Sequence, residues 1–211
     1  MSNVSEKYEA QNIQQEISER DEFTPERYDQ FARYLPKDAK DILDVGCNTG
    51  RGGERLKQNL DSINLYGLDC VKERLDALPN AYAKGIYGLS TEIPTEDKTF
   101  DAIVAGEFLE HLYPGDVDRT LCEFQRVLKI GGRLLLTTPN PKYLRNKLTR
   151  STVYGVSHLT QHYPDVLSLR FRMHGFSGIK ILGSGKMSRY LGVHFPIRSV
   201  YGSYLIFGDK I

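Results

Sequence analysis

A short apolar run that opens directly into a glycine-dense turn constrains the fold of this chain more than any other feature. Residues 41–45 (DILDV) have the length and composition of a buried strand, and Gly46–Gly53 contains four glycines at the start of a helical pattern over 51–60. Residues without a side chain let the main chain approach a ligand that a Cβ atom would block. The same spacing also occurs in ordinary strand-to-helix turns, so this segment alone leaves a ligand-binding loop and a plain turn open.

Apolar strand-like segments and helical segments alternate along most of the chain. We expect Gly131-Gly132 to close one of the helices. Alternation at this spacing is typical of a sheet covered by helices on both faces. The sequence therefore predicts an α/β protein with a doubly wound, seven-stranded sheet. The expected helices are 24–35, 51–60, 71–78, 116–128 and 164–174, and the expected strands are 41–45, 64–68, 81–87, 100–105, 133–137, 178–182 and 201–207.

The first 22 residues differ in composition from the rest of the chain. They contain six acidic and two basic residues, and Tyr8, Ile13 and Ile17 form an apolar stripe that is too narrow for a buried helix. We expect residues 1–22 to form a polar acidic N-terminal leader, with a lid over a ligand as the alternative. Residues 23–211 contain no internal repeat, low-complexity tract or linker, and we expect them to form a single domain.

Cysteine content and charge bear on compartment and partners. The three cysteines form no CxxC pair, which favours a reducing cytoplasm, and no apolar run approaches the roughly 18 residues of a membrane-spanning helix. The net charge of +1 is a cancellation, because residues 1–141 carry 17 Lys+Arg and 25 Asp+Glu, whereas residues 142–211 carry 11 Lys+Arg and only two acids. The net charge therefore does not exclude an anionic partner for the basic part of the chain. The chain has no nucleic-acid-binding module, and we expect no nucleic acid.

An acidic residue ends the second predicted strand. Asp69 lies 19 residues beyond Gly50, where a carboxylate can accept hydrogen bonds from both ribose hydroxyls of a nucleoside. The alternative role for Asp69 is to cap the helix predicted over 71–78. Its position beside the glycine turn favours a nucleoside ligand.

Four segments together resemble a known family. The runs ILDVGCNTG, LYGLD, FDAIVAGEFLEHL and LKIGGRLLLTTPN occur in the order seen in class I S-adenosylmethionine-dependent methyltransferases, and are most similar to the small-molecule branch called type 11 or type 12. The resemblance covers about residues 26–208. It implies a Rossmann-like, mostly parallel sheet whose seventh strand is antiparallel and lies between strands five and six. It also implies S-adenosylmethionine as cofactor and S-adenosylhomocysteine as product.

The resemblance assigns roles to residues of the predicted cofactor site. In that family the acid at the position of Asp44 orders the loop and approaches the methionine ammonium, the loop Gly46–Gly50 passes beneath the methionine, and Asp69 holds the ribose. The position of Gly106-Glu107, after the fourth strand, lines the methionine and acceptor side. The full set expected at the cofactor is Asp44, Gly46, Cys47, Asn48, Gly50, Asp69, Cys70, Leu89, Ser90 and Glu107.

Two positions depart from the family pattern. Asn48 replaces the middle glycine of the usual loop, and asparagine tolerates left-handed backbone geometry better than most residues. Gly88-Leu89-Ser90 replaces Gly-Asp-Ala, so an adenine contact is missing or comes from Ser90. A dinucleotide dehydrogenase is the nearest structural rival, but its Gly-x-Gly-x-x-Gly fingerprint is absent.

Two of the five histidines are candidates for a general base. Methyl transfer to an alcohol requires removal of its proton, which histidine suits. His111 follows the fourth predicted strand, and His158 opens a segment that resembles the family's acceptor-side His-x-Arg-x-Tyr-Thr-Pro. We favour His158 over His111. Glu107 and Glu110 could converge with both histidines on a metal ion, but we expect a metal-free site.

A basic loop follows the fifth predicted strand. Lys142, Arg145, Lys147 and Arg150 occur there without an acid, and such a run is either a solvated face or a site that recruits anions. Similar loops occur in methyltransferases that act on glycans. We therefore predict O-methylation of a small polar, possibly anionic acceptor such as a sugar, a glycan end or a glycan precursor. The alternatives are N-methylation of a small molecule and a non-catalytic cofactor-binding regulatory subunit.

Overall fold

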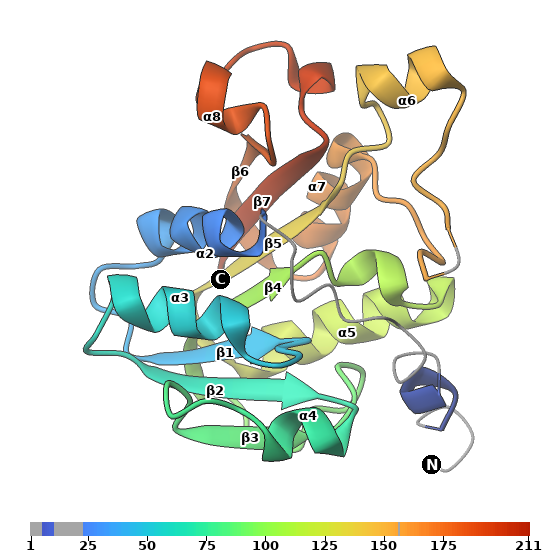
Figure 1. Cartoon of the computed structure of the whole chain (residues 1–211). Helices are drawn as coiled ribbons and strands as arrows, with labels where there is room; N and C mark the ends of the chain where they lie inside the picture. Colours follow the sequence, from blue (N-terminus) through green and yellow to red (C-terminus); the bar gives the residue numbers. More distant parts are fainter. Residues whose placement is uncertain (1–5, 11–22, 156) are drawn as a thin grey trace.

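Seven strands form one sheet through the middle of the molecule, with helices on both faces (Figure 1). The computed structural model describes residues 6–10, 23–155 and 157–211. The strands are β1 (Asp41–Val45), β2 (Asn64–Asp69), β3 (Lys84–Tyr87), β4 (Phe100–Gly106), β5 (Leu128–Pro139), β6 (Phe176–Ser184) and β7 (Ser203–Lys210). The helices are α2 (Phe23–Tyr34), α3 (Arg51–Asn59), α4 (Lys72–Asp76), α5 (Pro114–Val127), α6 (Leu144–Thr149), α7 (Pro164–Met173) and α8 (Ser188–Leu191), with 3-10 turns η1 (Leu109–His111) and η2 (Arg198–Val200).

The strand order predicts where a ligand binds, namely at the carboxyl ends of the central strands β1 and β4. The order is β3-β2-β1-β4-β5-β7-β6, and β7 runs antiparallel to both β5 and β6. This confirms the predicted doubly wound sheet with its antiparallel seventh strand between strands five and six. Since β1 pairs with β2 on one side and with β4 on the other, the connections diverge there. Open α/β sheets bind ligands at such a point, beyond the carboxyl ends of the strands.

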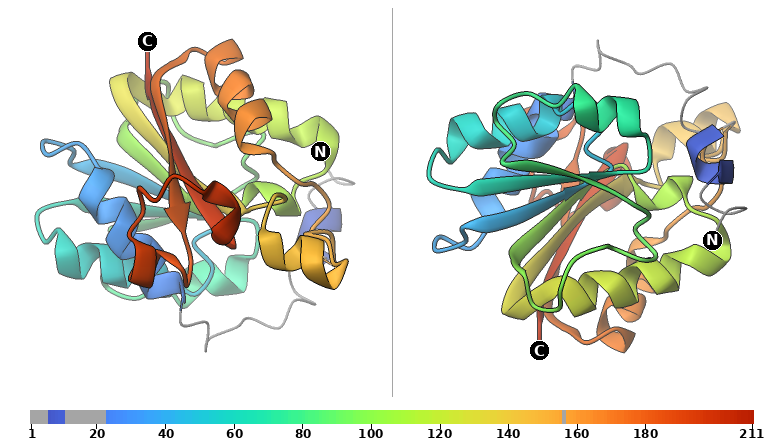
Figure 2. Two further views of the ribbon diagram at one scale, coloured as in Figure 1. Left: turned by 90° about the horizontal axis from the view of Figure 1, so that it is seen from above. Right: turned by 90° about the horizontal axis from the view of Figure 1, so that it is seen from below.

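Alternate residues of the central strands enter two apolar cores. Ile42 belongs to the core that contains the buried side of α2 and α3, whereas Leu43 belongs to the core that contains α5 and α7. Leu135 and Leu134 divide between the two cores in the same way. Figure 2 shows these helix pairs on opposite sides of the sheet. Coverage of both faces explains why the strands are continuous apolar runs rather than alternating ones.

The helix predicted over 116–128 is present as α5, but the role predicted for Gly131-Gly132 was wrong. The helix ends at Val127 and β5 begins at Leu128, so Gly131 and Gly132 lie inside the strand instead of closing the helix. Leu128 pairs with Phe100 at the start of β4, and a register shift separates that pair from the rest of the ladder. The early pairing extends β5 well beyond the predicted 133–137, because a partner strand, not local sequence, decides where a strand begins.

Four other regions differ from the prediction. The third strand is only β3, shorter than the predicted 81–87, and the helix after β2 is the five-residue α4 instead of 71–78. The long loop after β5 contains α6, and the stretch before β7 contains α8 and η2, none of which was predicted. Among the described helices, none has the length and apolar character needed to cross a membrane.

Part of the predicted leader docks on the domain. Residues 6–10 are helical, whereas the prediction for residues 1–5 and 11–22 falls outside the described part of the chain. Tyr8 is buried: its hydroxyl donates to Asp116 Oδ2 at 2.7 Å and accepts from the Tyr113 main-chain N–H at 2.9 Å. The segment therefore lies against the start of α5, next to the carboxyl end of the sheet.

Candidate active site

The turn after β1 has the backbone geometry that its small residues allow. Gly46, Asn48 and Gly50 all have positive φ, at 66°, 53° and 83°. A Cβ atom on Gly46 would lie 2.7 Å from the ring of Phe108, and one on Gly50 would lie 2.5 Å from Pro79. Asn48 adopts the left-handed conformation that the sequence predicted it would tolerate. Glycine is thus required at both ends of the turn and asparagine is accepted in the middle.

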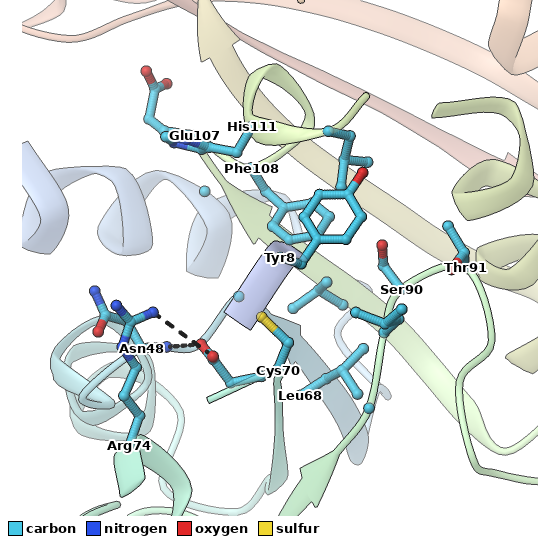
Figure 3. A pocket seen from close by; sticks show the side chains of 17 residues that line it. Tyr8, Asn48, Leu68, Cys70, Arg74, Ser90, Thr91, Glu107, Phe108 and His111 are labelled. Carbon is cyan, nitrogen blue, oxygen red and sulfur yellow. Dashed lines mark hydrogen bonds and ion pairs between the residues drawn. The ribbon is translucent and has the colours of Figure 1, made fainter. Parts of the chain in front are cut away.

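Asp69 ties this turn to the end of β2. One carboxylate oxygen accepts from the Asn48 N–H at 3.0 Å and the other from the Val71 N–H at 2.9 Å, so both the loop and the helix start depend on it. Arg74 Nη1 lies 3.7 Å from the carboxylate, and Figure 3 draws the contacts made by Asn48 and Arg74 as dashed lines. Burial raises the pKa of Asp69, and the main-chain donors and Arg74 act against that rise.

A cavity opens above this turn, at the carboxyl ends of β1, β2 and β4. It comprises about 850 Å³ when the solvent at its open mouth is counted. Seven residues of the predicted cofactor set line it, namely Gly46, Asn48, Asp69, Cys70, Leu89, Ser90 and Glu107. The lining also includes Gly88 and Gly106, which neighbour predicted residues, and residues that sequence reasoning did not select: Tyr8, Val45, Leu68, Arg74, Thr91, Phe108 and Leu112.

The other three predicted cofactor residues do not line the cavity. Asp44 is fully buried, and its two carboxyl oxygens accept from the hydroxyls of Tyr28 at 2.6 Å and Tyr82 at 2.5 Å. Burial raises the pKa of Asp44 to about 7, against the effect of these hydrogen bonds. Cys47 is buried beside the main chain of β2, and Gly50 is at the start of α3. The carboxyl group of Asp44 thus orders the elements beneath the loop.

Tyr8 and Arg74 are the most informative of the residues that were missed. Tyr8 lines the cavity, although it lies 108 residues before its hydrogen-bond partner Asp116 in the sequence. No local pattern near the glycine turn therefore predicts its position. Its place in the apolar stripe of the leader was the available clue. Arg74 lies on α4, five residues after Asp69, where a helix that follows β2 returns a basic side chain to the acid.

A second, larger cleft adjoins the first cavity. It comprises about 1960 Å³, including its open side, and is lined by α2, α6, residues 152–155 and 157–158, and residues 184–189 near the end of β6. Of the four basic residues predicted at the acceptor, only Arg145 lines this cleft. Lys142 forms an ion pair with Asp165 at 2.8 Å, and Lys147 and Arg150 are not among the lining residues. Further cationic residues line it from other elements: Arg27, Arg33, Lys186 and Arg189.

Glu107 lines both the cavity and the second cleft. Its backbone has a φ of 52°, which is uncommon for a residue with a side chain. Its Oε1 atom is buried without a hydrogen-bond partner among the described residues and lies 3.9 Å from Arg27 Nε, while Ser203 Oγ donates to Oε2 at 3.3 Å. A strained residue with an unsatisfied carboxylate oxygen at the junction of two cavities is a candidate for ligand contact.

The two predicted bases are neighbours. The rings of His111 and His158 pack edge to face with centres 5.0 Å apart, His111 lining the cavity and His158 the cleft. His111 Nδ1 lies 2.9 Å from the Ser157 carbonyl oxygen, and His158 Nδ1 lies 2.8 Å from that of Val153. A carbonyl only accepts, so each Nδ1 carries a proton, and in a neutral imidazole the lone pair is then on Nε2. Burial, with a contribution from His158, lowers the pKa of His111 to about 4.

The amino-acid sequence is similar to a known protein family and to several known proteins. Residues 43–136 match the family described as Methyltransferase domain. The fatty-acid O-methyltransferase of Mycolicibacterium smegmatis is 31% identical over 134 residues, which cover 60% of this chain and 48% of that protein. Malonyl-[acyl-carrier protein] O-methyltransferase 1 of Coxiella burnetii is 33% identical over 122 residues, which cover 58% and 41%. The chain thus spans about half the length of these relatives, or less.

A solved structure supports the fold. The crystal structure of a SAM dependent methyltransferase from Archaeoglobus fulgidus aligns with a TM-score of 0.68 at 20% identity, over 88% of this chain and 92% of that one. At this identity the likeness concerns the arrangement of strands and helices, whereas substrates depend on the residues of each site.

Proposed function

This chain carries a class I, S-adenosylmethionine-dependent methyltransferase domain, and on that premise we propose that it transfers a methyl group from S-adenosylmethionine to an oxygen of a polar acceptor. The observation that carries the proposal is Glu107, which lines both the cavity beside Asp69 and the adjoining cleft. Ligands in the two spaces would meet at this residue, as a transfer between them requires.

Two features of the cavity support S-adenosylmethionine as its ligand. Gly46 leaves room that a Cβ atom would fill, and the Asn48 side-chain oxygen is buried without a hydrogen-bond partner among the described residues. We propose that Asp69 holds the ribose hydroxyls, that the loop at Gly46 and Asn48 holds the methionine, and that Glu107 faces its ammonium group. Leu89 and Ser90 would contact the adenine. Acidic groups at a cationic ligand are favourable.

The reaction needs alignment and, for an alcohol, a proton acceptor. When bound, S-adenosylmethionine supplies a methyl carbon on a sulfonium, so that the carbon–sulfur bond breaks to a neutral thioether as the new carbon–oxygen bond forms. The described residues would align the acceptor from the cleft and exclude water. His158 Nε2, which keeps its lone pair, would take the proton of a hydroxyl acceptor. A carboxylate acceptor would need no base.

The cleft supports an acceptor that carries a negative charge. Arg33, Arg145 and Lys186 line it from three different elements, and guanidinium and ammonium groups recognise phosphate and carboxylate. A sugar or glycan precursor remains one proposed acceptor. The printed names of the relatives give a fatty acid and malonyl-acyl carrier protein, so acyl carboxylates join the proposal. The free state of Cys47, Cys70 and Cys122 supports a reducing, cytoplasmic compartment.

Calorimetric titration with S-adenosylhomocysteine tests the cofactor half of the proposal. We expect saturable binding that Asp69→Ala weakens by at least about tenfold, since a charge-assisted hydrogen bond contributes about 1.5–3 kcal/mol. Asp38→Ala, which removes an exposed acid, is the matched control and should bind like wild type. Absence of binding at millimolar ligand, or equal affinities for the wild type and the Asp69 variant, would contradict the placement.

Transfer of a labelled methyl group tests the acceptor half. The panel contains sugar phosphates, glycan ends, acyl carboxylates and primary amines, so that O-methylation and N-methylation are separated. We expect incorporation into an anionic oxygen acceptor. Incorporation only into amines would establish the nitrogen-directed alternative, and S-adenosylhomocysteine binding without any incorporation would favour the non-catalytic subunit.

A further inference from the structure

Two segments that are distant in sequence bring three metal-ligating side chains together. One possible ligand atom from each of Glu110, His111 and His158 lies within 4.8 Å of the other two. Glu110 and His111 belong to η1 after β4, whereas His158 comes from the segment before α7. The main-chain N–H groups of Leu159 and Thr160 both donate to the Glu110 carbonyl, at 2.7 and 3.1 Å. Backbone hydrogen bonds therefore fix the position of the cluster.

The two imidazoles are arranged as metal ligands commonly are. A ligating histidine usually donates its second ring N–H to a carbonyl or carboxylate, which orients the ring and leaves the other nitrogen for the ion. Both His111 and His158 place Nδ1 on a main-chain carbonyl. Two imidazoles that share a tetrahedral ion at about 2.1 Å from each nitrogen have ring centres about 5 Å apart, and the observed separation is 5.0 Å.

Hydrogen bonds from the described residues satisfy only part of the Glu110 carboxylate. The residue is 1% exposed, and its Oε2 accepts from Thr138 Oγ1 at 3.1 Å. Its Oε1 is buried and has no hydrogen-bond partner among the described residues. Burial of a carboxylate oxygen without a partner is costly, and the group must either keep a proton or meet a cation. An ion bound by the two histidines would be that cation.

We propose that Glu110, His111 and His158 bind a divalent transition-metal ion of the Zn²⁺ class. Two histidines and one glutamate with a fourth position open to solvent or substrate are a known catalytic zinc ligand set. The ion lies where the cavity meets the cleft, since His111 lines the first and His158 the second.

The role of the ion rests on the proposed function, whereas its binding does not. A divalent ion with an open position binds an acceptor oxygen and lowers its pKa. With the ion bound, the proton of a hydroxyl acceptor leaves to solvent, and the histidine Nε2 lone pairs serve as ligands instead of as bases. The alternative is a metal-free cluster in which Glu110 is protonated and the histidines only pack.

Metal titration of chelator-treated, dialysed protein tests the site without any acceptor. Calorimetry with Zn²⁺ should give one site per chain, and Co²⁺ should develop the visible absorption of a low-coordinate histidine site. His111→Ala, His158→Ala and Glu110→Gln should each weaken Zn²⁺ binding by about 100-fold or more, because even loss of a second-shell partner costs 10–100-fold. His194→Ala, which removes an exposed histidine outside the cluster, should bind metal like wild type.

Two readouts keep the result interpretable. Thermal unfolding of each variant shows whether it is folded, and S-adenosylhomocysteine binding by the same samples tests the cofactor site separately. Equal Zn²⁺ affinity in the wild type and in folded variants, or no Co²⁺ absorption band in the wild type, would overturn the metal site. If the metal site is overturned but S-adenosylhomocysteine still binds, the proposed function keeps its support. If metal binds but S-adenosylhomocysteine does not, only the proposed function is contradicted.

Discussion

The buried carboxyl group of Asp44 makes a quantitative prediction about folding stability. Its pKa rises from 3.8 to about 7 because no water reaches it, although Tyr28 and Tyr82 donate to it. A carboxyl whose pKa is raised by folding binds its proton more tightly in the folded state. The free energy of unfolding must therefore fall as the pH rises from the unfolded pKa to the folded one.

The size of this effect follows from the two pKa values. The pKa of Asp44 is about 7 in the folded protein and 3.8 in the unfolded chain. Proton linkage therefore lowers the free energy of unfolding by about 3 kcal/mol between pH 4 and pH 7. Asp44→Asn keeps a neutral side chain of the same shape and removes the titration. The difference in unfolding free energy between wild type and Asp44→Asn should thus shift by about 3 kcal/mol in favour of the variant over this range.

Urea unfolding at 25 °C, at several pH values from 4 to 8, measures this difference. The comparison cancels the effects of other titrating groups, such as Asp69 and His111, whose shifts have opposite consequences. Asp38→Asn, which alters an exposed acid, serves as control and should show no such shift. If the wild type and Asp44→Asn have parallel pH profiles, the buried carboxyl is not protonated on folding and the reasoning fails.

Three further changes test other parts of the structure. Gly46→Ala places a Cβ atom 2.7 Å from Phe108 at a φ of +66°, so S-adenosylhomocysteine affinity by calorimetry should fall at least about tenfold, since left-handed geometry alone costs about 1–2 kcal/mol. Tyr8→Phe leaves Asp116 and the Tyr113 N–H without their shared partner and should lower stability in urea by about 1–2 kcal/mol. Binding of an anionic acceptor should weaken with salt, and Arg145→Ala should reduce that salt dependence; unchanged values would contradict each expectation.

Local sequence predicted the glycine turn after β1 and the acid at the end of β2, because both depend on backbone geometry. Gly46 and Gly50 could be placed because a turn with positive φ needs glycine, and Asp69 because strand ends converge at one edge of a parallel sheet. The order of the strands followed from the resemblance to the methyltransferase family. These features are encoded within a few residues of one another or in the order of segments along the chain.

Contacts between distant segments could not be predicted in the same way. The tyrosines that take both oxygens of Asp44 come from 16 and 38 residues away, and Tyr8 reaches Asp116 across 108 residues. The basic loop after β5 was recognisable as a charge run, but only packing decides that Arg145 faces the cleft. Side-chain orientation in such cases depends on tertiary partners whose identity no local period reveals.

The two hydrogen bonds to the Glu110 carbonyl have a consequence for how this protein can be redesigned. They join main chain to main chain, from Leu159 and Thr160 to η1, so the side chains of residues 150–155 can be exchanged without losing this attachment. A library that varies residues 150–155 should therefore alter which molecules enter the cleft while leaving the cavity beside Asp69 intact. The cleft and the cavity are thus separable engineering targets within one chain.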